Sequence, residues 1–162
     1  MNKEQFTTEV LHAEKSMYHI AITILNHEDD CKDAMQNAVL HAFEKLHTLK
    51  NEKYFKTWII RILINECNQV IRQRKNQVPY DEAYEQSAVT PPRLEDSEVL
   101  MTLKELPKDY QIPFVLFYIE DFSVKEISQL LKISPGAVKN RLYRGRMMMK
   151  EKLTGGYAYE AK

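Results

Sequence analysis

The stretch SPGAVKNRLYRGR, residues 134–146, carries four cationic side chains and an amide in one short segment. Guanidinium and amide groups can form paired hydrogen bonds with guanine and adenine edges, and a lysine ammonium attracts phosphate. The positive charge continues, because residues 139–152 hold six cations and one acid. Residues 81–98 hold six acids and one cation, so the zero net charge of the chain hides two oppositely charged segments. A charge run alone more often marks a solvated basic face, so its neighbours must decide.

Catalytic residues, metal ligands and cofactors are not predicted. The histidines lack metal-ligand spacing, and no Ser/His/Asp or Cys/His arrangement is evident. The two cysteines, Cys31 and Cys67, form no Cys-x-x-Cys pair, which argues against a zinc site and a disulfide framework. No stretch approaches the roughly 18 apolar residues of a membrane span. We expect a cytoplasmic protein that is not an enzyme.

The elements that must position the basic segment are helices, because apolar residues recur at intervals of three, four and seven. A first helix is followed by a polar turn at residues 26–30, a second helix over about 31–46 and a third over about 54–74. The predicted inward residues are Phe6, Val10, Met17, Ala21 and Ile24 in the first helix, Met35, Val39, Ala42 and Leu46 in the second, and Phe55, Ile59, Ile62, Cys67 and Val70 in the third.

Residues 77–96 lose this periodicity, become acidic and contain three prolines, which predicts a flexible linker. We therefore expect an all-α protein of two small helical domains, at residues 1–76 and 97–155, followed by a tail at 156–162. The second domain contains an apolar helix over about 112–119. Pro113 is tolerable there only in the first turn of that helix.

Two capping signals precede the basic segment. Ser123 and Glu126 form a capping-box pattern, and Ser134 followed by Pro135 is typical of another helix start. The short turn between these helices has the spacing of a helix-turn-helix. The second helix of such a motif places its exposed side chains in the DNA major groove.

The segment VKEISQLLKISPGAVKNRLYRGRMMMKEKL resembles the fourth region of extracytoplasmic-function (ECF) sigma factors, in the sigma-70 family of RNA polymerase subunits. The typical Gly-Thr-Val-Lys-Ser-Arg-Leu is matched at five positions, with Ala137 and Asn140 replacing Thr and Ser. The resemblance implies recognition of the minus-thirty-five promoter element. The residues expected at this DNA are Ser134, Pro135, Gly136, Lys139, Asn140, Arg141 and Arg144.

The segment DDCKDAMQNAVLHAFEKL resembles the second-region helix that docks on the clamp of polymerase in the same family. Asp33 and Gln36 occupy the family's Asp-x-x-Gln, while Lys32 stands where an acid is usual. The expected polymerase-binding residues are Asp33, Gln36, Val39 and Phe43. For Asp33 and Gln36 taken alone, a solvated helix face is the better interpretation.

The segment FKTWIIRILINECNQVIRQRK resembles the family's helix that melts and holds the minus-ten element. The residues expected there are Trp58, Arg61, Asn65, Asn68 and Arg72, whose spacing places them on one helical face. Aromatic and amide groups on a basic face suit unstacked bases. Trp58 alone is as well explained as a core residue. The preceding loop, HTLKNEKYFKT, is where the family captures a flipped base.

The resemblance implies an alternative sigma factor that directs promoter-specific initiation. Its expected partners are core RNA polymerase, through the β′ clamp and the β flap, promoter DNA, and a cognate anti-sigma factor, which in the family is often membrane-anchored. Two other classes remain open on the residues alone. They are a stand-alone helix-turn-helix transcriptional regulator and a helical interaction protein that only mimics a sigma factor.

Overall fold

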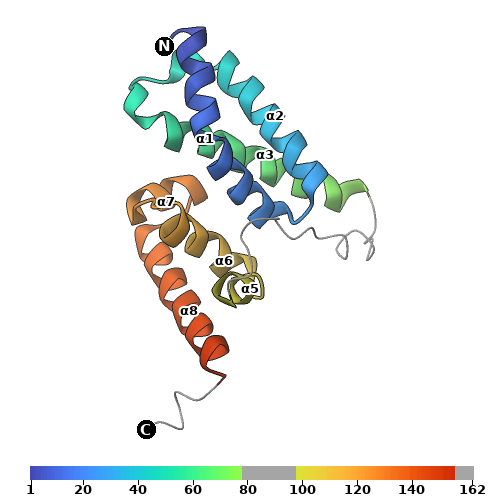
Figure 1. Ribbon diagram of the computed structural model, residues 1–162, viewed down its shortest axis with the longest axis vertical. Helices are drawn as coiled ribbons and strands as arrows, with labels where there is room; N and C mark the ends of the chain where they lie inside the picture. Colours follow the sequence, from blue (N-terminus) through green and yellow to red (C-terminus); the bar gives the residue numbers. More distant parts are fainter. Residues whose placement is uncertain (78–97, 156–162) are drawn as a thin grey trace. The chain divides into compact units, whose positions relative to one another are not determined.

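The computed structural model describes residues 1–77 and 98–155, and within these ranges the secondary structure is helical, without strands (Figure 1). The chain divides into two compact units, Met1–Thr90 and Pro91–Lys162. The all-α prediction is confirmed. Nearly all of the predicted linker, residues 77–96, and the tail, residues 156–162, lie outside the described residues.

The first helix, α1 (Lys3–Leu25), is closed at both ends by local signals. The Asn2 side chain accepts a hydrogen bond from the Gln5 backbone N–H and the Gln5 side chain accepts one from the Asn2 N–H, each 2.8 Å long. Asn26 ends the helix in the left-handed conformation, with φ of 54°. The predicted polar turn at 26–30 is too long, because α2 (Glu28–Glu44) already begins at Glu28. Its first turn carries three acids, which the helix dipole stabilises.

The buried face of α2 consists of small side chains. Cys31, Ala34, Ala38 and Ala42 are each 0% exposed. Of the inward residues predicted for the second helix only Ala42 is buried, whereas Met35 and Val39 are half-buried; Leu46, also half-buried, lies beyond the end of α2. The prediction was therefore wrong in its register around the helix. Small side chains let the α2 backbone approach its neighbours closely, and the larger side chains are displaced to the edge of the contact.

The third long helix, α3 (Phe55–Gln77), packs against both α1 and α2. It follows two short 3-10 helices, η1 (Leu46–Thr48) and η2 (Glu52–Tyr54). Its contact with two neighbours widens the buried face beyond the single predicted stripe. The predicted residues Phe55, Ile59 and Cys67 are buried, as are Ile60, Leu63 and Ile64, which were not predicted. The predicted Ile62 and Val70 are only half-buried.

Two polar contacts hold α3 to the other helices of this unit. Arg74 forms an ion pair with Asp30 and lies 3.4 Å from the Leu25 carbonyl oxygen, joining the end of α3 to the junction of α1 and α2. Glu66 on α3 is 8% exposed and is paired with His41 Nδ1 on α2. These contacts fix the orientation of α2 relative to α3.

The second unit contains α5 (Glu98–Leu103), α6 (Lys108–Phe114), the π-helix η3 (Val115–Ile119), α7 (Val124–Leu131) and α8 (Pro135–Thr154). Its buried apolar cluster contains Leu103, Leu106, Val115 and Met149. The long helix α8 packs against α5, α6 and α7. It is therefore the element around which this unit is built.

Pro113 does not lie in a first helical turn, so that prediction was wrong. It is the sixth residue of α6 and is buried. Proline has no N–H and its ring crowds the carbonyl four residues earlier, so a regular helix is interrupted there. The chain continues directly into η3, where the Glu120 N–H donates to the Val115 carbonyl oxygen over 3.0 Å, a five-residue span. A wider turn accommodates the interruption without ending the helical path.

The junction of α7 and α8 follows the predicted helix-turn-helix. The Ser123 Oγ accepts from the Glu126 N–H over 3.1 Å and a Glu126 carboxylate oxygen accepts from the Ser123 N–H, completing the capping box. Lys132 ends α7 in the left-handed conformation, with φ of 59°. The Ser134 Oγ accepts from the Ala137 N–H over 3.0 Å, and Pro135 is the first residue of α8. The predicted caps are confirmed.

Candidate functional site

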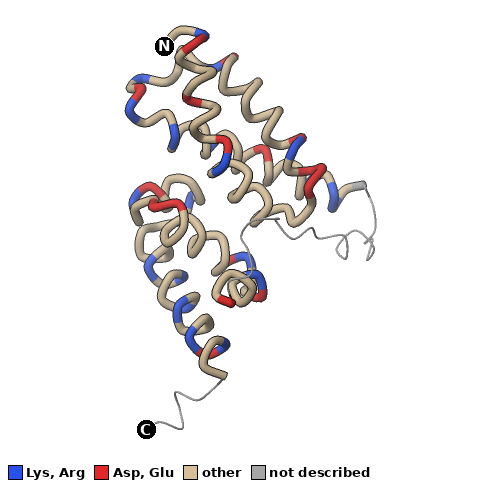
Figure 2. Tube along the Cα trace, viewed as in Figure 1, with Lys and Arg blue, Asp and Glu red and all other residues tan. Residues whose placement is uncertain are grey.

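The outward face of α8 carries most of the residues predicted at the minus-thirty-five element. Pro135, Gly136, Lys139, Asn140 and Arg144 are exposed. On the opposite face Val138, Leu142, Gly145 and Met149 are buried against the rest of the unit. Lysine and arginine positions recur along the length of this helix (Figure 2). Because one face of α8 packs against the unit, the opposite face, with its basic side chains and the Asn140 amide, remains exposed.

Ser134 and Arg141 are placed differently from the other members of this set. The Ser134 hydroxyl is exposed but already caps α8. The Arg141 side chain is 32% exposed, and its Nη1 lies 3.9 Å from an Asp109 carboxylate oxygen on α6. Arg141 therefore lies at the edge of the exposed face, where it links α8 to α6.

The outward face of α3 carries the residues predicted at the minus-ten element. Arg61, Asn65, Asn68 and Arg72 are all exposed. Trp58 is half-buried, and its ring centroid lies 5.7 Å from that of the buried Phe55. The indole is thus partly buried in the core and partly exposed at the surface. It is neither a fully buried core residue nor a fully exposed DNA-binding residue.

The loop before α3 contains an exposed aromatic residue that sequence reasoning did not single out. Tyr54 is 56% exposed at the end of η2, and the Lys53 Nζ lies 5.9 Å from its ring centroid. Asn51 caps η2 by accepting from the Lys53 N–H over 3.0 Å. A capped turn therefore presents a cation and a ring directly before the start of α3.

An apolar groove of about 540 Å³ lies between α1 and α2. Its lining residues are Val10, Leu11, Glu14, Met17, Lys32, Met35, Gln36, Val39 and Leu40. Leu11 and Leu40 are 62% and 60% exposed, which is unusual for large apolar side chains. Such a groove, bordered by a few polar groups, has the character of a surface that receives another helix.

Of the residues predicted to bind polymerase, Gln36 and Val39 line this groove. Asp33 and Phe43 do not line it but lie exposed on the same helix, and the Phe43 ring contacts the Phe6 ring at 5.3 Å between centroids. Sequence reasoning missed the contribution of α1, including Leu11. For α2, the available signal was the repeat of small residues Cys31, Ala34, Ala38 and Ala42. This repeat identifies the packed face of the helix and indicates that Met35 and Val39 lie outside it, where they line the groove.

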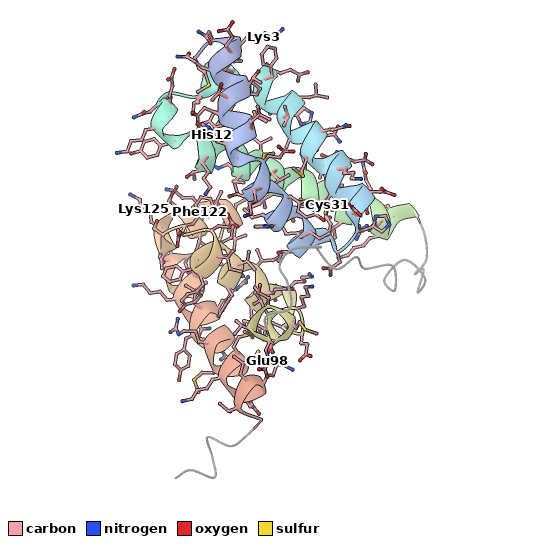
Figure 3. All side chains as sticks on the ribbon, in the orientation of Figure 1. Lys3, His12, Cys31, Glu98, Phe122 and Lys125 are labelled. Atoms are coloured by element: carbon pink, nitrogen blue, oxygen red, sulfur yellow. The ribbon has the colours of Figure 1, made fainter. Side chains whose placement is uncertain are left out.

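The two cysteines are free thiols buried in the first unit; Cys31 lies near the start of α2 (Figure 3). Burial raises the pKa of both thiols to about 12. Among the described residues, no three His, Cys, Asp or Glu side chains are grouped so that they could hold a metal ion. Within the same ranges no helix is both long and apolar enough to cross a membrane.

Comparison with known proteins assigns each unit separately. Residues 10–77 match the family Sigma-70 region 2, and residues 96–149 match the family Sigma-70, region 4. The RNA polymerase sigma factor SigV of Bacillus subtilis is 29% identical over 161 residues, covering 95% of this chain and 97% of SigV. The ECF RNA polymerase sigma factor SigW of the same organism is 26% identical, covering 85% of this chain and 82% of SigW.

The fold is also found in a solved structure. The sigma factor RpoE, in its complex with the anti-sigma factor NepR from Bartonella quintana, superposes with a TM-score of 0.78 at 21% identity. The superposition covers 93% of this chain and 98% of RpoE.

Proposed function

The chain belongs to the sigma-70 family of RNA polymerase sigma factors, and on that premise we propose that it is an alternative, extracytoplasmic-function sigma factor. In this role it binds core RNA polymerase and directs initiation at specific promoters. The observation that carries the proposal is the presence of both family regions in one chain, each on a folded unit with an exposed surface suited to its task. A stand-alone regulator would need only the helix-turn-helix, so that alternative is not favoured.

The first unit would dock on polymerase through the groove between α1 and α2. Leu11, Val39 and Leu40 supply apolar surface, while Gln36 and Lys32 border it with polar groups. An amphipathic helix laid in such a groove loses water from its apolar face and keeps its polar face solvated. We assign the β′ clamp to this groove, with Asp33 and Phe43 extending the contact along α2.

The same unit would hold the separated minus-ten strand on the outward face of α3. Arg61 and Arg72 offer positive charge to phosphates, while Asn65 and Asn68 can donate to and accept from exposed base edges. The half-buried Trp58 is anchored on Phe55, so only part of its ring is available for stacking. No protein group here needs to react, because polymerase forms the bonds.

The second unit would read the minus-thirty-five element as duplex. Asn140 and Arg144 are one turn apart on the exposed face of α8, where both can reach base edges in the major groove. Gly136 and Pro135 keep the start of α8 free of long side chains, so its N-terminal turn can approach a phosphate. Ser134 acts through the cap, and Arg141 acts at the edge of the interface.

Further parts of the proposal follow from the family. The protein works in the cytoplasm without catalytic residues or a cofactor, the β flap is a second polymerase contact, and an anti-sigma factor restrains it. Relatives of this fold have been solved with anti-sigma factors, RpoE with NepR and CnrH with the cytosolic domain of CnrY. For this chain the natural target of such a partner is the apolar groove of the first unit, because occupying it would compete with polymerase.

A run-off transcription experiment with core RNA polymerase and fragmented genomic DNA tests the proposal. Addition of the chain should produce discrete transcripts that core polymerase alone does not make, and Arg144→Ala should reduce them. Gln129→Ala, an exposed change on α7, serves as the control and should leave the transcripts unchanged. If the chain fails to bind core polymerase, or binds and leaves the transcripts unaltered, the proposed function is wrong.

A further inference from the structure

A second stripe of side chains runs along α8 beside the residues assigned to base recognition. Lys139, Tyr143, Arg146 and Lys150 follow one another at intervals of four, three and four, so they share one side of the helix. All four are exposed. The stripe is about 16 Å long, which is enough to face several phosphates of one DNA strand.

Arg146 is held in place by neutral groups. Its Nη1 donates to the Tyr118 phenol oxygen over 3.0 Å, and its guanidinium carbon lies 6.0 Å from the Tyr143 ring centroid. Arg141 is paired with Asp109 and Lys152 with Glu105, whereas no ion pair of Arg146 is found among the described residues. A phenol and a ring face orient the guanidinium while leaving its positive charge available.

Tyr118 is itself fixed by packing. Its ring centroid lies 4.6 Å from that of Phe114 and 4.9 Å from that of Phe117. It belongs to the π-helix η3, whose wider turn changes the direction of its side chains relative to a continuous α-helix. Tyr118 is nonetheless 43% exposed, so its role is not limited to filling the core.

We infer that Tyr118 is a positioning residue that presents Arg146, together with Tyr143, as a preorganised site for a backbone phosphate of promoter DNA. A free arginine side chain loses conformational entropy when it grips a phosphate, and the two contacts remove part of that loss beforehand. The guanidinium uses one of its five donors on Tyr118, so paired donors remain for a phosphate. The inference rests on the proposed function, because it assumes that this face of α8 meets DNA.

The test measures binding of the full chain to a fluorescent 30-base-pair duplex of arbitrary sequence, by anisotropy, from low to moderate salt. Arg146→Gln should weaken binding about fivefold and lower the slope of log affinity against log salt by about 0.9, the value for one phosphate contact. Tyr118→Phe keeps the ring and the arginine, so it should weaken binding about twofold to threefold. In the double variant the loss should not exceed that of Arg146→Gln alone, because Tyr118 acts through Arg146.

Two matched controls on the same unit are available. Lys104→Gln removes one exposed positive charge next to α5, and Tyr110→Phe removes the phenol oxygen of a half-buried tyrosine on α6. The inference is overturned if Arg146→Gln changes the salt slope no more than Lys104→Gln does. It is also overturned if the Tyr118 and Arg146 effects simply multiply, or if Arg146→Gln weakens binding to core polymerase and leaves duplex binding unchanged. Since no polymerase is needed for duplex binding, failure here is distinct from failure of the run-off experiment.

Discussion

Leu40→Ala should weaken binding to core RNA polymerase without unfolding the protein. Leu40 is 60% exposed on α2 and lines the apolar groove, so it contributes little to the core of its unit. Full burial of a leucine side chain contributes about 1.5–3 kcal/mol, so burying its exposed part at a polymerase contact is worth about 1–2 kcal/mol. Truncation to alanine removes most of that contribution and should raise the dissociation constant about tenfold.

The assay is titration of fluorescently labelled chain with core polymerase, accompanied by thermal unfolding followed by circular dichroism. Leu11→Ala faces the same groove from α1 at 62% exposure and should show a similar loss. His12→Ala is the matched control, because its side chain is 72% exposed on the same helix and does not line the groove. It should leave the dissociation constant unchanged.

If both leucine variants kept the affinity of the unchanged protein while melting normally, the assignment of this groove to polymerase would be refuted. The groove would then be an exposed apolar surface with another use, and the polymerase contact would lie elsewhere on the chain. If the leucine variants lost affinity and also melted at a clearly lower temperature, this would also count against the assignment, because the leucines would then stabilise the fold rather than bind polymerase.

Three further changes test the packing that supports these surfaces. Gly145→Ala should raise the stability of the second unit by about 0.5–1 kcal/mol in thermal unfolding, since alanine favours a helix and the added methyl group would meet its neighbours at an ordinary 3.6 Å. His41→Ala should lower the free energy of unfolding by about 1 kcal/mol, because the buried Glu66 loses its partner, and this cost should vanish in a Glu66→Leu background. Because burial raises the pKa of Cys31 and Cys67 from 9.0 to about 12, the unfolded chain releases protons in this range that the folded chain keeps. Urea unfolding should therefore show full stability below about pH 9 and a loss of up to about 1.4 kcal/mol per thiol for each pH unit above it, a loss that Cys67→Ala reduces.

The helix-turn-helix was predictable from the sequence because its signals are local. The Ser123 capping box and the Ser134-Pro135 start each satisfy backbone groups within a few residues, so neighbouring residues alone determine them. The exposed positions of Lys139 and Arg144 followed from the buried positions of the same helix. The exposure of Arg61, Asn65, Asn68 and Arg72 on α3 was predictable in the same way.

The register of α2 was not predictable in this way. Hydrophobic periodicity counts apolar side chains and ignores their size, so Met35 and Val39 were assigned to the core. The structure places Ala34 and Ala38 there instead, because α2 lies close to two other helices at once. The core and the exposed groove both consist of apolar residues, so hydrophobicity alone cannot tell them apart. Only the packing of the helices shows which residues are buried. This explains why hydrophobic periodicity assigns Met35 and Val39, which line the apolar groove between α1 and α2, to the core.

Pro113 was misplaced for a different reason, which bears on the function of the second unit. Proline is confined to the first turn of a helix because it lacks one backbone hydrogen bond and its ring clashes with the carbonyl four residues earlier. Both costs apply to Pro113. The π-helix that follows absorbs them within five residues, at a site where α8 packs across α6. A departure from local preference persists only when the surrounding fold supports it, and such departures often accompany functional positions. Here the irregular turn carries Tyr118, whose hydrogen bond to Arg146 reaches the basic face of α8, so the unpredicted geometry and the inferred phosphate site have the same structural origin.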